Sequence, residues 1–566
     1  MPRPEAFDLD RQRLGPLPIV NHFLGRLGIE ETLERFVPTT GRSSISYAKG
    51  LGVLLRSIIV EREPIYRQQE LVRGFWPPLF GLREEQVESL SDDRIGRALE
   101  RLFDADRAAL LTEVVVHMAK RFSVSFGELH NDSTTVRFCG QYRRAHGRWI
   151  RGKTAPWITY GKSKDHRPDL KQLLFVLSST ADGGIPVQFR CESGNTEDST
   201  THIDTWNALK QIAGRPDFLY VADCKLCTRE NMDYIHERDG RFVTVIPRNR
   251  VEDSEFRDWI QTHEPEWELV WDRPNPRRRY GPRDRWWVFR YPIPSREGWP
   301  VTWVRSSLLA LRQEQRRRER IAKALEELED LKGKLQSPRN RLRKPSEIDQ
   351  RIDTIVSENH VTGYVRPERL VEEEHRYRQK TPGRPGPDTE YRRFTRRIFN
   401  VVWEVDERAI DYDRKSDGMY PLLSNDRSLT GPEVLVAHKA QPTIEKRFEQ
   451  TKTVHEIAPV FLKNEDRVEG LLFLYFLALL VQALIERELR RAMKRRGISN
   501  LPIYPEERSC ERPTTEQVLR LFSLCQRDVL TRSGKVVQVF DVELSDLQRQ
   551  VLGLMGVQKD AYALPL

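Results

Sequence analysis

The sequence contains few cysteines, no apolar stretch of membrane-spanning length and no N-terminal signal core. Its six cysteines are scattered over 566 residues, which is typical of thiols in a reducing compartment and not of a disulfide framework. The longest apolar run, Leu471 to Ile485, has fifteen residues, whereas a membrane span needs about twenty. The first residues, MPRPEAFDLDRQRLG, include no apolar secretion signal. We therefore expect a cytoplasmic protein with no membrane partner, in which 471–485 is a buried helix.

Cys224 and Cys227 form an isolated C-x-x-C pair. A structural zinc site needs a second pair of Cys or His ligands at similar spacing, and no such pair accompanies this one. We interpret the two cysteines as small residues at the end of a strand, with metal or redox chemistry as the alternative.

Charge is abundant and its balance is basic. Lys and Arg number 94 against 84 for Asp and Glu, which gives a formal charge of +10 and a pI near 9.2. A basic balance suits a polyanionic partner such as nucleic acid. The length predicts two to four domains, because a single core rarely grows this large.

Helical patterns fill residues 1–122. Apolar residues recur at helical spacing in 45–60 and 95–103, and Ser91 and Asp104 are candidate N-caps for the helices that follow them. No strand-like alternation interrupts the region. We expect an all-α N-terminal domain, which either binds DNA ends or buttresses the rest of the protein.

From Phe126 onward, strand and helix patterns alternate through residues 123–247, which predicts an α/β sheet with helices on its faces. The expected strands are FGELHNDSTTVRF, WITYG, LKQLLFVLSS continued by GIPVQFRC, FLYVAD and RFVTVIP, with helices THIDTWNALKQIAG and TRENMDYIHERD.

Residues 248–426 break this alternation and are interpreted as an insertion. They include a charged helix over Ser306 to Gln336, whose leucine spacing fits a coiled coil, and the linker QKTPGRPGPDT followed by the strand-like TEYRRFTRRIFNVVWEV. Residues 427–500 would return to the α/β domain. A C-terminal tail, 501–566, is expected to be mainly helical with a strand pair around KVVQVFDV.

Two aspartates stand where a metal site could form. Asp132 interrupts a strand pattern with short polar neighbours, and Asp223 ends the apolar strand FLYVAD, at the edge where open α/β sheets place their sites. Two such carboxylates can bind a hard cation, and a third would allow two ions to sit together. The structural alternative is that both residues are turn formers and caps.

The segment IEKRFEQTK carries Glu445 and Lys452 at an E-x6-K spacing, with an aromatic residue, Phe448, between them. With the D-x-T-T-like text at Asp132 and the strand ending at Asp223, this resembles the DDE transposases of bacterial insertion sequences, in the branch with a Y-x2-R-x3-E-x6-K signature. The resemblance to this family extends over further segments of the sequence, to about residue 520. The signature's Tyr falls on His438 and its Arg on Gln441, so these two positions depart from the pattern that helps hold DNA in the family.

The resemblance implies a ribonuclease H-like catalytic core, formed by 123–247 and 427–500 around the insertion. It implies that Asp132, Asp223 and Glu445 are catalytic and bind Mg²⁺, with Mn²⁺ as a substitute and two ions as the expected number. It also implies cleavage at transposon ends and strand transfer, with terminal inverted repeats and target duplex DNA as partners and a homodimer on DNA.

Several cationic residues are candidates for DNA contact. Lys452 would lie on the same helix face as Glu445 and contact phosphate. The SKDHR loop either contacts DNA or is a solvated hairpin loop, and the basic aromatic stretch near 285 either stacks on bases or is structural. The residues concerned are Lys164, His166 and Arg167 in the loop, and Arg285, Trp286 and Trp287 in the stretch.

Other interpretations stay open at this stage. His130 is interpreted as supporting Asp132 or facing away from it, with metal ligation as the alternative. A nuclease of the same fold that cuts without joining strands, or a domesticated DNA-binding protein without activity, would share much of this sequence pattern. Retention of all three carboxylates favours an active enzyme.

Overall fold

The computed structural model describes residues 7–563 except 40, 42, 144, 276–279, 338–339, 341, 451, 453–461, 463 and 534. The chain is mixed α/β and divides into two compact units. The first unit comprises residues 1–244, 424–426 and 436–566, and the second comprises 245–423 and 427–435. The first unit thus combines regions that the sequence analysis separates into an N-terminal domain, a catalytic domain and a tail.

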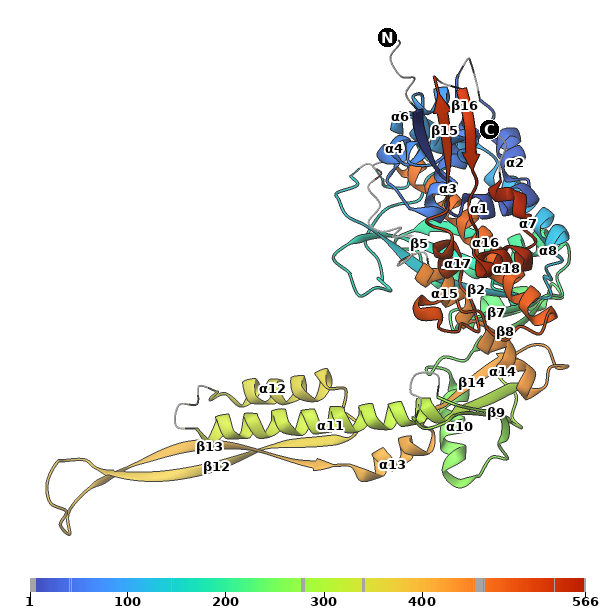
Figure 1. The fold of residues 1–566 in the computed structure, drawn as a ribbon. Helices are drawn as coiled ribbons and strands as arrows, with labels where there is room; N and C mark the ends of the chain where they lie inside the picture. Colours follow the sequence, from blue (N-terminus) through green and yellow to red (C-terminus); the bar gives the residue numbers. More distant parts are fainter. Residues whose placement is uncertain are drawn as a thin grey trace. The chain divides into compact units, whose positions relative to one another are not determined.

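A mixed sheet forms the centre of the first unit. Its strands lie in the order β6-β5-β2-β7-β8; β5 is antiparallel to β2 and β6, and β7 is parallel to β2 and β8. The bounds are β2 Glu128–Phe138, β5 Lys171–Thr180, β6 Pro186–Ser193, β7 Leu219–Ala222 and β8 Arg241–Val245. Helices α8 (His202–Ala213) and α9 (Arg229–His236) connect β6, β7 and β8 in sequence. Strands β2, β5, β7 and β8 and helix α8 are labelled in Figure 1.

One expected strand is absent. WITYG (157–161) forms only isolated bridges, between Trp157 and His146 and between Thr159 and Gln172. The prediction was wrong because a short aromatic run with a glycine lacks the length for a stable ladder of hydrogen bonds. The segment is a loop that makes only these two bridges. The second and third strands along the chain in this sheet are therefore β5 and β6, which form a hairpin.

Helices fill most of the N-terminal region, and Ser91 caps α6 as expected, accepting a hydrogen bond from the Arg94 amide at 3.2 Å. The cap of α7 is Asp106, whereas Asp104 is the last residue of α6. The helices are α1 Leu17–Leu27, α2 Ile29–Phe36, α3 Tyr47–Val60, α4 Gln68–Arg73, α5 Glu84–Val87, α6 Asp92–Asp104 and α7 Arg107–Phe122.

The N-terminal region is not all-α. Residues Phe7–Arg13 form β1, which pairs antiparallel with β15 (Gln526–Arg532), and β16 (Lys535–Phe540) completes this small sheet. The sequence gives little sign of β1, because FDLDRQR is polar and lacks a long alternating pattern. Its conformation comes from the ladder offered by the C-terminal tail, which also contains α17 (Thr515–Leu521) and α18 (Asp546–Met555).

Helix α16 (Glu465–Arg495) is the central helix of the first unit. It is long and apolar enough to cross a membrane by length and composition, but 89% of its most apolar window is buried within the protein. Helices α1, α3 and α6 pack against it. At Gly470 the approach is so close that an added Cβ would lie 2.7 Å from the Leu99 carbonyl oxygen, which explains the glycine. The expected buried helix over 471–485 is confirmed.

The second unit begins with α10 (Val251–Thr262) and contains strands in the order β14-β11-β10-β9. Its antiparallel strands are β9 Glu268–Arg273, β10 Asp284–Arg290, β11 Val301–Ser306 and β14 Met419–Ser424. Helix α13 (Glu407–Lys415) precedes β14, and α14 (Gly431–Ala440) follows it.

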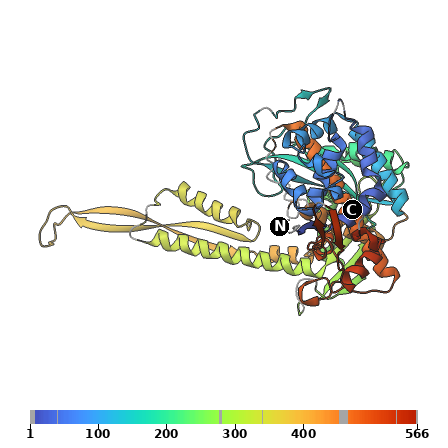
Figure 2. The same ribbon diagram turned by 45° about the horizontal axis from the view of Figure 1, so that its top comes forward.

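Helix α11 (Ser307–Gln336) has the leucine stripe of the predicted coiled coil, but its partners are mixed. Leu328, Leu331 and Leu335 are buried with residues of α12 (Pro345–Glu358) and with Phe399 and Val401 of a β-ribbon. The ribbon pairs β12 (Val365–Gln379) with β13 (Tyr391–Val405) over their full lengths. Figures 1 and 2 show it running on beyond the two helices.

The packing of α16 predicts that residues 123–566 do not fold alone. Removing 1–122 would expose the faces of α16 that α1, α3 and α6 cover, together with the Leu99 and Gly470 contact. Because large apolar faces drive aggregation when uncovered, we expect the fragment to be insoluble or to unfold without cooperativity. Co-expression of 1–122 as a separate chain should restore soluble protein. A soluble fragment with a cooperative urea transition would contradict this role for α16.

Candidate active site

The register of β2 and β7 brings two aspartates together. The strands pair in parallel through His130 with Val221 and Asn131 with Ala222, so the next positions along the two strands are Asp132 and Asp223. Neighbouring strands lie about 4.8 Å apart, and equivalent positions on parallel strands share a face. The two carboxylates expected from the sequence therefore stand side by side where β7 ends.

Asp132 is only partly accessible, with 22% of its side chain exposed. The pKa of Asp132 is raised to about 6, mainly by burial; the nearby charges of Asp223 and Glu445 also raise it, while Lys164 and the Ser133 amide lower it. The Ser133 amide donates to Asp132 Oδ1 at 2.7 Å. The charges of the other two predicted catalytic carboxylates, Asp223 and Glu445, are therefore close enough to raise the pKa of Asp132.

Asp223 begins the turn after β7. The Lys225 amide donates to its Oδ1 at 2.9 Å, and the Thr244 hydroxyl donates to its backbone carbonyl at 2.7 Å, which ties the strand end to β8. Burial raises the pKa of Asp223, partly offset by the Lys225 amide and by Lys164, and Asp198 raises it further. Burial therefore disfavours the charged form of Asp223 unless a cation lies nearby.

Lys164 supplies a cation at the site. Its ammonium Nζ lies 4.0 Å from Asp132 Oδ1 and 2.8 Å from Asp198 Oδ2, and it donates to the Ser133 carbonyl at 2.8 Å. Lys164 was expected from the sequence to contact DNA, whereas Asp198 was not singled out. The signal for Asp198 was its acidic side chain in SGNTEDSTTH, the segment that follows β6, but only the fold shows that this segment lies beside Lys164.

Glu445 lies on α15 (Pro442–Glu449), which packs against β2 and β5. Ile444 and Phe448 of this helix are buried, whereas Glu445 is exposed. The helix thus turns its apolar side to the protein and leaves Glu445 accessible, close enough to Asp132 to influence its pKa.

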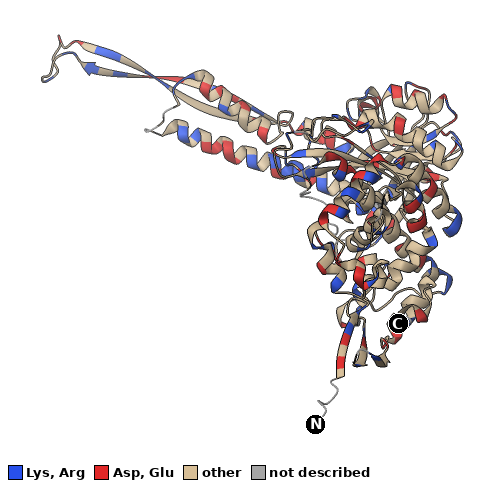
Figure 3. Cartoon of the chain, turned by 90° about the horizontal axis from the view of Figure 1, so that it is seen from above, with Lys and Arg blue, Asp and Glu red and all other residues tan. Residues whose placement is uncertain are grey.

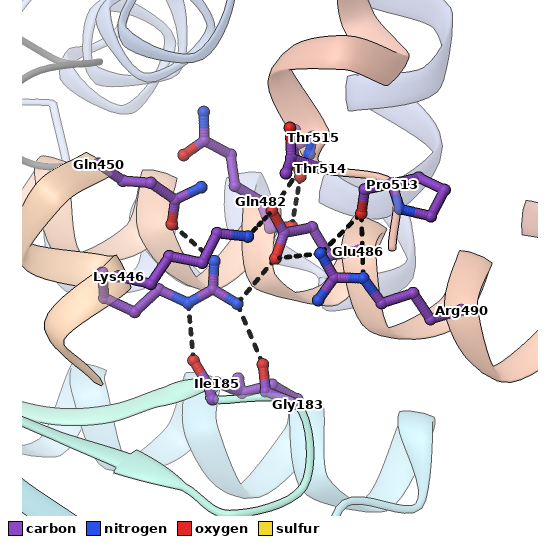
Figure 4. A network of polar contacts seen from close by, with 12 residues as sticks. Gly183, Ile185, Lys446, Gln450, Gln482, Glu486, Arg490, Pro513, Thr514 and Thr515 are labelled. Atoms are coloured by element: carbon purple, nitrogen blue, oxygen red, sulfur yellow. Dashed lines mark hydrogen bonds and ion pairs between the residues drawn. The ribbon is translucent and has the colours of Figure 1, made fainter. Parts of the chain in front are cut away.

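A buried ion network anchors α15 (Figure 4). Arg447 donates to the carbonyls of Gly184 and Gly183 at 2.9 and 3.0 Å, in the tight turn between β5 and β6. Glu486 of α16 accepts from Lys446 at 3.0 Å and lies 3.1 Å from Arg447 Nη2, and the Thr515 amide donates to it at 3.2 Å. The network joins the helix of Glu445 to the sheet, to α16 and to the tail.

Lys452 pairs with Asp165 of the SKDHR loop, and Arg137 of β2 lies 3.4 Å from the same carboxylate. The loop and the expected E-x6-K lysine are therefore brought together. His166 and Arg167 are exposed, and Arg167 forms an ion pair with Asp169 at 2.7 Å.

The remaining positions are His130, His438 and Gln441. His130 is buried and bonds to Glu128 at 2.8 Å, so it is a strand residue two positions before Asp132. His438 is half-buried; its pKa is lowered to about 3, mainly by burial and also by Lys439 and His130. Gln441 is also buried. A neutral histidine and an amide thus occupy the places of the signature's Tyr and Arg.

The candidates near 285 belong to the second unit. Trp286 is 9% exposed and donates its indole N–H to Asp284 at 2.7 Å, so its role is structural and its ring is not a free stacking surface. Arg285 is exposed and lies 3.3 Å from Asp272, and Trp287 packs under Arg305. Residues 276–279 of the same basic stretch lie outside the described residues.

The chemistry of the acidic side chains at this site suits a hard divalent cation. Asp132, Asp223, Asp198 and Glu445 supply only carboxylate oxygens, which Mg²⁺ prefers. Within the described part of the chain, no three His, Cys, Asp or Glu side chains already stand in position to hold one ion together. Cys224 and Cys227 follow Asp223 in the sequence and are not joined by a disulfide.

At the sequence level, the N-terminal helices match a described family, a domain of unknown function (DUF4277), over residues 9–116. No curated protein matches the chain. Among solved structures, a cryo-EM piggyBac transposase synaptic complex with hairpin DNA is similar, with a TM-score of 0.36 and 9% sequence identity, covering 91% of this chain and 82% of that chain. A likeness of this degree carries no functional argument, so the function is inferred from the site.

The raised pKa of Asp132 predicts that Asp132→Asn stabilises the protein at neutral pH. The folded carboxyl holds its proton more tightly than the unfolded one, so its effect favours folding below about pH 4 and is lost as the pH rises through about 6. One pKa unit is worth about 1.4 kcal/mol, and solvent at the partly exposed side chain screens part of it. We expect a gain of about 1–2 kcal/mol in urea unfolding at pH 7 without metal.

The same measurement at pH 4 should show little difference between the two proteins. Adding Mg²⁺ at pH 7 should raise the melting temperature of the unaltered protein and leave that of Asp132→Asn nearly unchanged, because a ligand stabilises only the state that binds it. Equal stability at pH 7 would mean that Asp132 carries no desolvation cost.

Glu486 should be needed for the stability of the first unit. Glu486→Gln leaves Arg447 buried without its counter-ion, and breaking a buried pair in this way costs about 3–5 kcal/mol. The matched control is Glu70→Gln, which removes a pair between Glu70 and Arg67 at 3.0 Å with Glu70 64% exposed and should cost below about 1 kcal/mol. Similar urea midpoints for the two variants would contradict the anchoring role of the network.

Proposed function

We propose that the protein is a DNA transposase that uses Asp132, Asp223 and Glu445 as a three-carboxylate Mg²⁺ site. The observation that carries the proposal is the register of β2 and β7, which sets two desolvated aspartates side by side. The strand order β6-β5-β2-β7-β8 with β5 antiparallel supports a ribonuclease H-like core, in which the first acid lies on the first strand and the second follows the fourth.

The proposed reaction consists of two in-line phosphoryl transfers. In the first, water attacks the phosphodiester at a transposon end, and the bond between phosphorus and the 3′-oxygen breaks. In the second, the freed 3′-hydroxyl attacks a phosphodiester of target DNA, a new P–O bond forms and the target's 3′-oxygen leaves. Two bound Mg²⁺ ions would polarise the phosphate and favour ionisation of the attacking hydroxyl; Mn²⁺ would substitute.

The residues of this chain supply position and charge. Asp132 and Asp223 would hold the first ion and Glu445 would complete the second, with α15 fixed by the Glu486 network. Lys164 lies 4.0 Å from Asp132 and is paired with Asp198, and Lys452 is paired with Asp165 of the SKDHR loop. DNA phosphate would compete with Asp198 and Asp165 for these two ammonium groups.

Duplex DNA is the proposed partner, in the form of inverted repeats and target, with a homodimer holding two ends. The packing of α1, α3 and α6 on α16 supports a buttressing role for residues 1–122, and end recognition by their outer surfaces is part of the proposal. A nuclease that cuts without joining would use the same site, and a strand-transfer assay separates the two.

Asp132→Asn, Asp223→Asn and Glu445→Gln should each abolish cleavage of the element's own inverted repeats in Mg²⁺. Each removes one anionic metal ligand, so turnover should fall at least about a thousandfold while end binding stays near that of the unaltered protein. Glu449→Gln is the matched control, because Glu449 is an exposed glutamate on the same helix and should cleave normally.

Gel analysis of cut ends and filter binding in EDTA would measure the two effects separately. Ordinary cleavage by Glu445→Gln would remove Glu445 from the metal site. Loss of activity in Glu449→Gln alone would transfer the role to that residue.

A further inference from the structure

The β12–β13 ribbon has a basic outer half with no core of its own. Near its base, Val365, Phe399 and Val401 are buried against α11 and α12. From residue 376 to 396, here called the distal ribbon, the side chains are almost entirely exposed. An isolated two-stranded ribbon is marginally stable in water, so the distal ribbon adds little to the stability of the fold.

The distal ribbon concentrates positive charge. It contains seven Lys or Arg residues, Arg376, Arg378, Lys380, Arg384, Arg392, Arg393 and Arg396, against two acidic residues, Asp388 and Glu390 (Figure 3). Arg376 and Lys380 form ion pairs with Glu374 and Glu390. Among the described residues, no ion pair joins a carboxylate to Arg378, Arg392, Arg393 or Arg396.

Cross-strand register places most of these cations on one face of the ribbon and Arg393 on the other. Arg378 lies directly opposite Arg392, Arg376 opposite Phe394 and Tyr377 opposite Arg393. Like charges that face one another destabilise a ladder, so the Arg378–Arg392 pair works against the ribbon's own folding. Exposed rings stand between the cations: Tyr377 is 64% and Phe394 46% exposed.

We infer that the distal ribbon is an arm that binds duplex DNA in a groove, independently of the catalytic site. The inference rests on the proposed function for the choice of DNA as the polyanion. A two-stranded ribbon fits the major groove, which is about 12 Å wide. The arginine forks, most of them on one face with Arg393 on the other, then reach the phosphate backbones, and the aromatic rings lie against the groove walls.

The charges and rings of the distal ribbon argue against two other partners, a second copy of the ribbon and a membrane surface. Two copies of the distal ribbon would repel each other, because each carries the same excess of cations. An anionic membrane surface would attract the arginines, but insertion needs a continuous apolar face, and Tyr377, Tyr391 and Phe394 are separated by charged residues along the strands. Duplex DNA satisfies both the charge and the ribbon's width.

The test uses the full-length protein with Arg378, Arg392, Arg393 and Arg396 all replaced by Gln. Binding to a fluorescent 30-base-pair duplex of mixed sequence is measured in EDTA between roughly 50 and 200 mM salt. We expect affinity at the lower salt to fall at least about tenfold, and the slope of log affinity against log salt to become shallower by about 2–4, since each lost phosphate contact contributes about 0.9.

Two matched variants control for charge and folding. Arg312, Arg316, Arg318 and Arg320 lie exposed on α11 of the same unit, and their replacement by Gln removes the same charge from a helix face; this variant should keep near-normal affinity. Replacing the four ribbon arginines by Lys should retain most of the binding. Urea unfolding should be alike in all variants.

Unchanged affinity in the ribbon Gln variant would overturn the inference, and so would an equal loss in the α11 variant, because net charge alone would then explain it. Loss of binding to phosphatidylserine vesicles with unchanged DNA affinity would assign the arm to membranes and also overturn it. The proposed function is tested separately: absent cleavage with ribbon-dependent DNA binding would refute the transposase alone.

Discussion

Two buried, like-charged side chains at the end of the β2–β7 strand pair constrain the structure around the candidate site. Asp132 and Asp223 occupy equivalent positions on β2 and β7, and burial raises the pKa of each. Repulsion between the two side chains opposes the parallel pairing that creates the site. Lys164 offsets part of this repulsion, and the buried residues Leu219 to Ala222 of β7 hold the strand against the remainder.

The third carboxylate depends on a different part of the chain. An eight-residue helix such as α15 is not stable alone, so the position of Glu445 is fixed by what α15 contacts. Arg447 and Lys446 connect the helix to Glu486 of α16, and α16 is in turn held by the N-terminal helices. Residues 1–122 therefore support the candidate site through packing, without contributing a side chain to it.

The second unit follows a different design. Its inner part has an apolar core between α11, α12 and the base of the ribbon, whereas the distal ribbon presents charge and rings to solvent. Exposed strand edges invite unwanted pairing, and charged residues discourage it. The arginines can therefore serve two purposes, keeping the ribbon from pairing with other strands and making it attractive to a polyanion.

Local sequence patterns predict the acidic residues of the candidate site and much of the secondary structure. Asp132 in a strand, Asp223 at a strand end, the Ser91 cap and apolar stripe of α6, the leucine stripe of α11 and the buried run in α16 all follow from spacing and residue type. The remaining features depend on tertiary contacts. β1 became a strand through β15, WITYG lost its ladder, Asp198 joined the site, and Trp286 was buried. Each depends on a partner distant in sequence, and no local pattern records which partner the chain will meet.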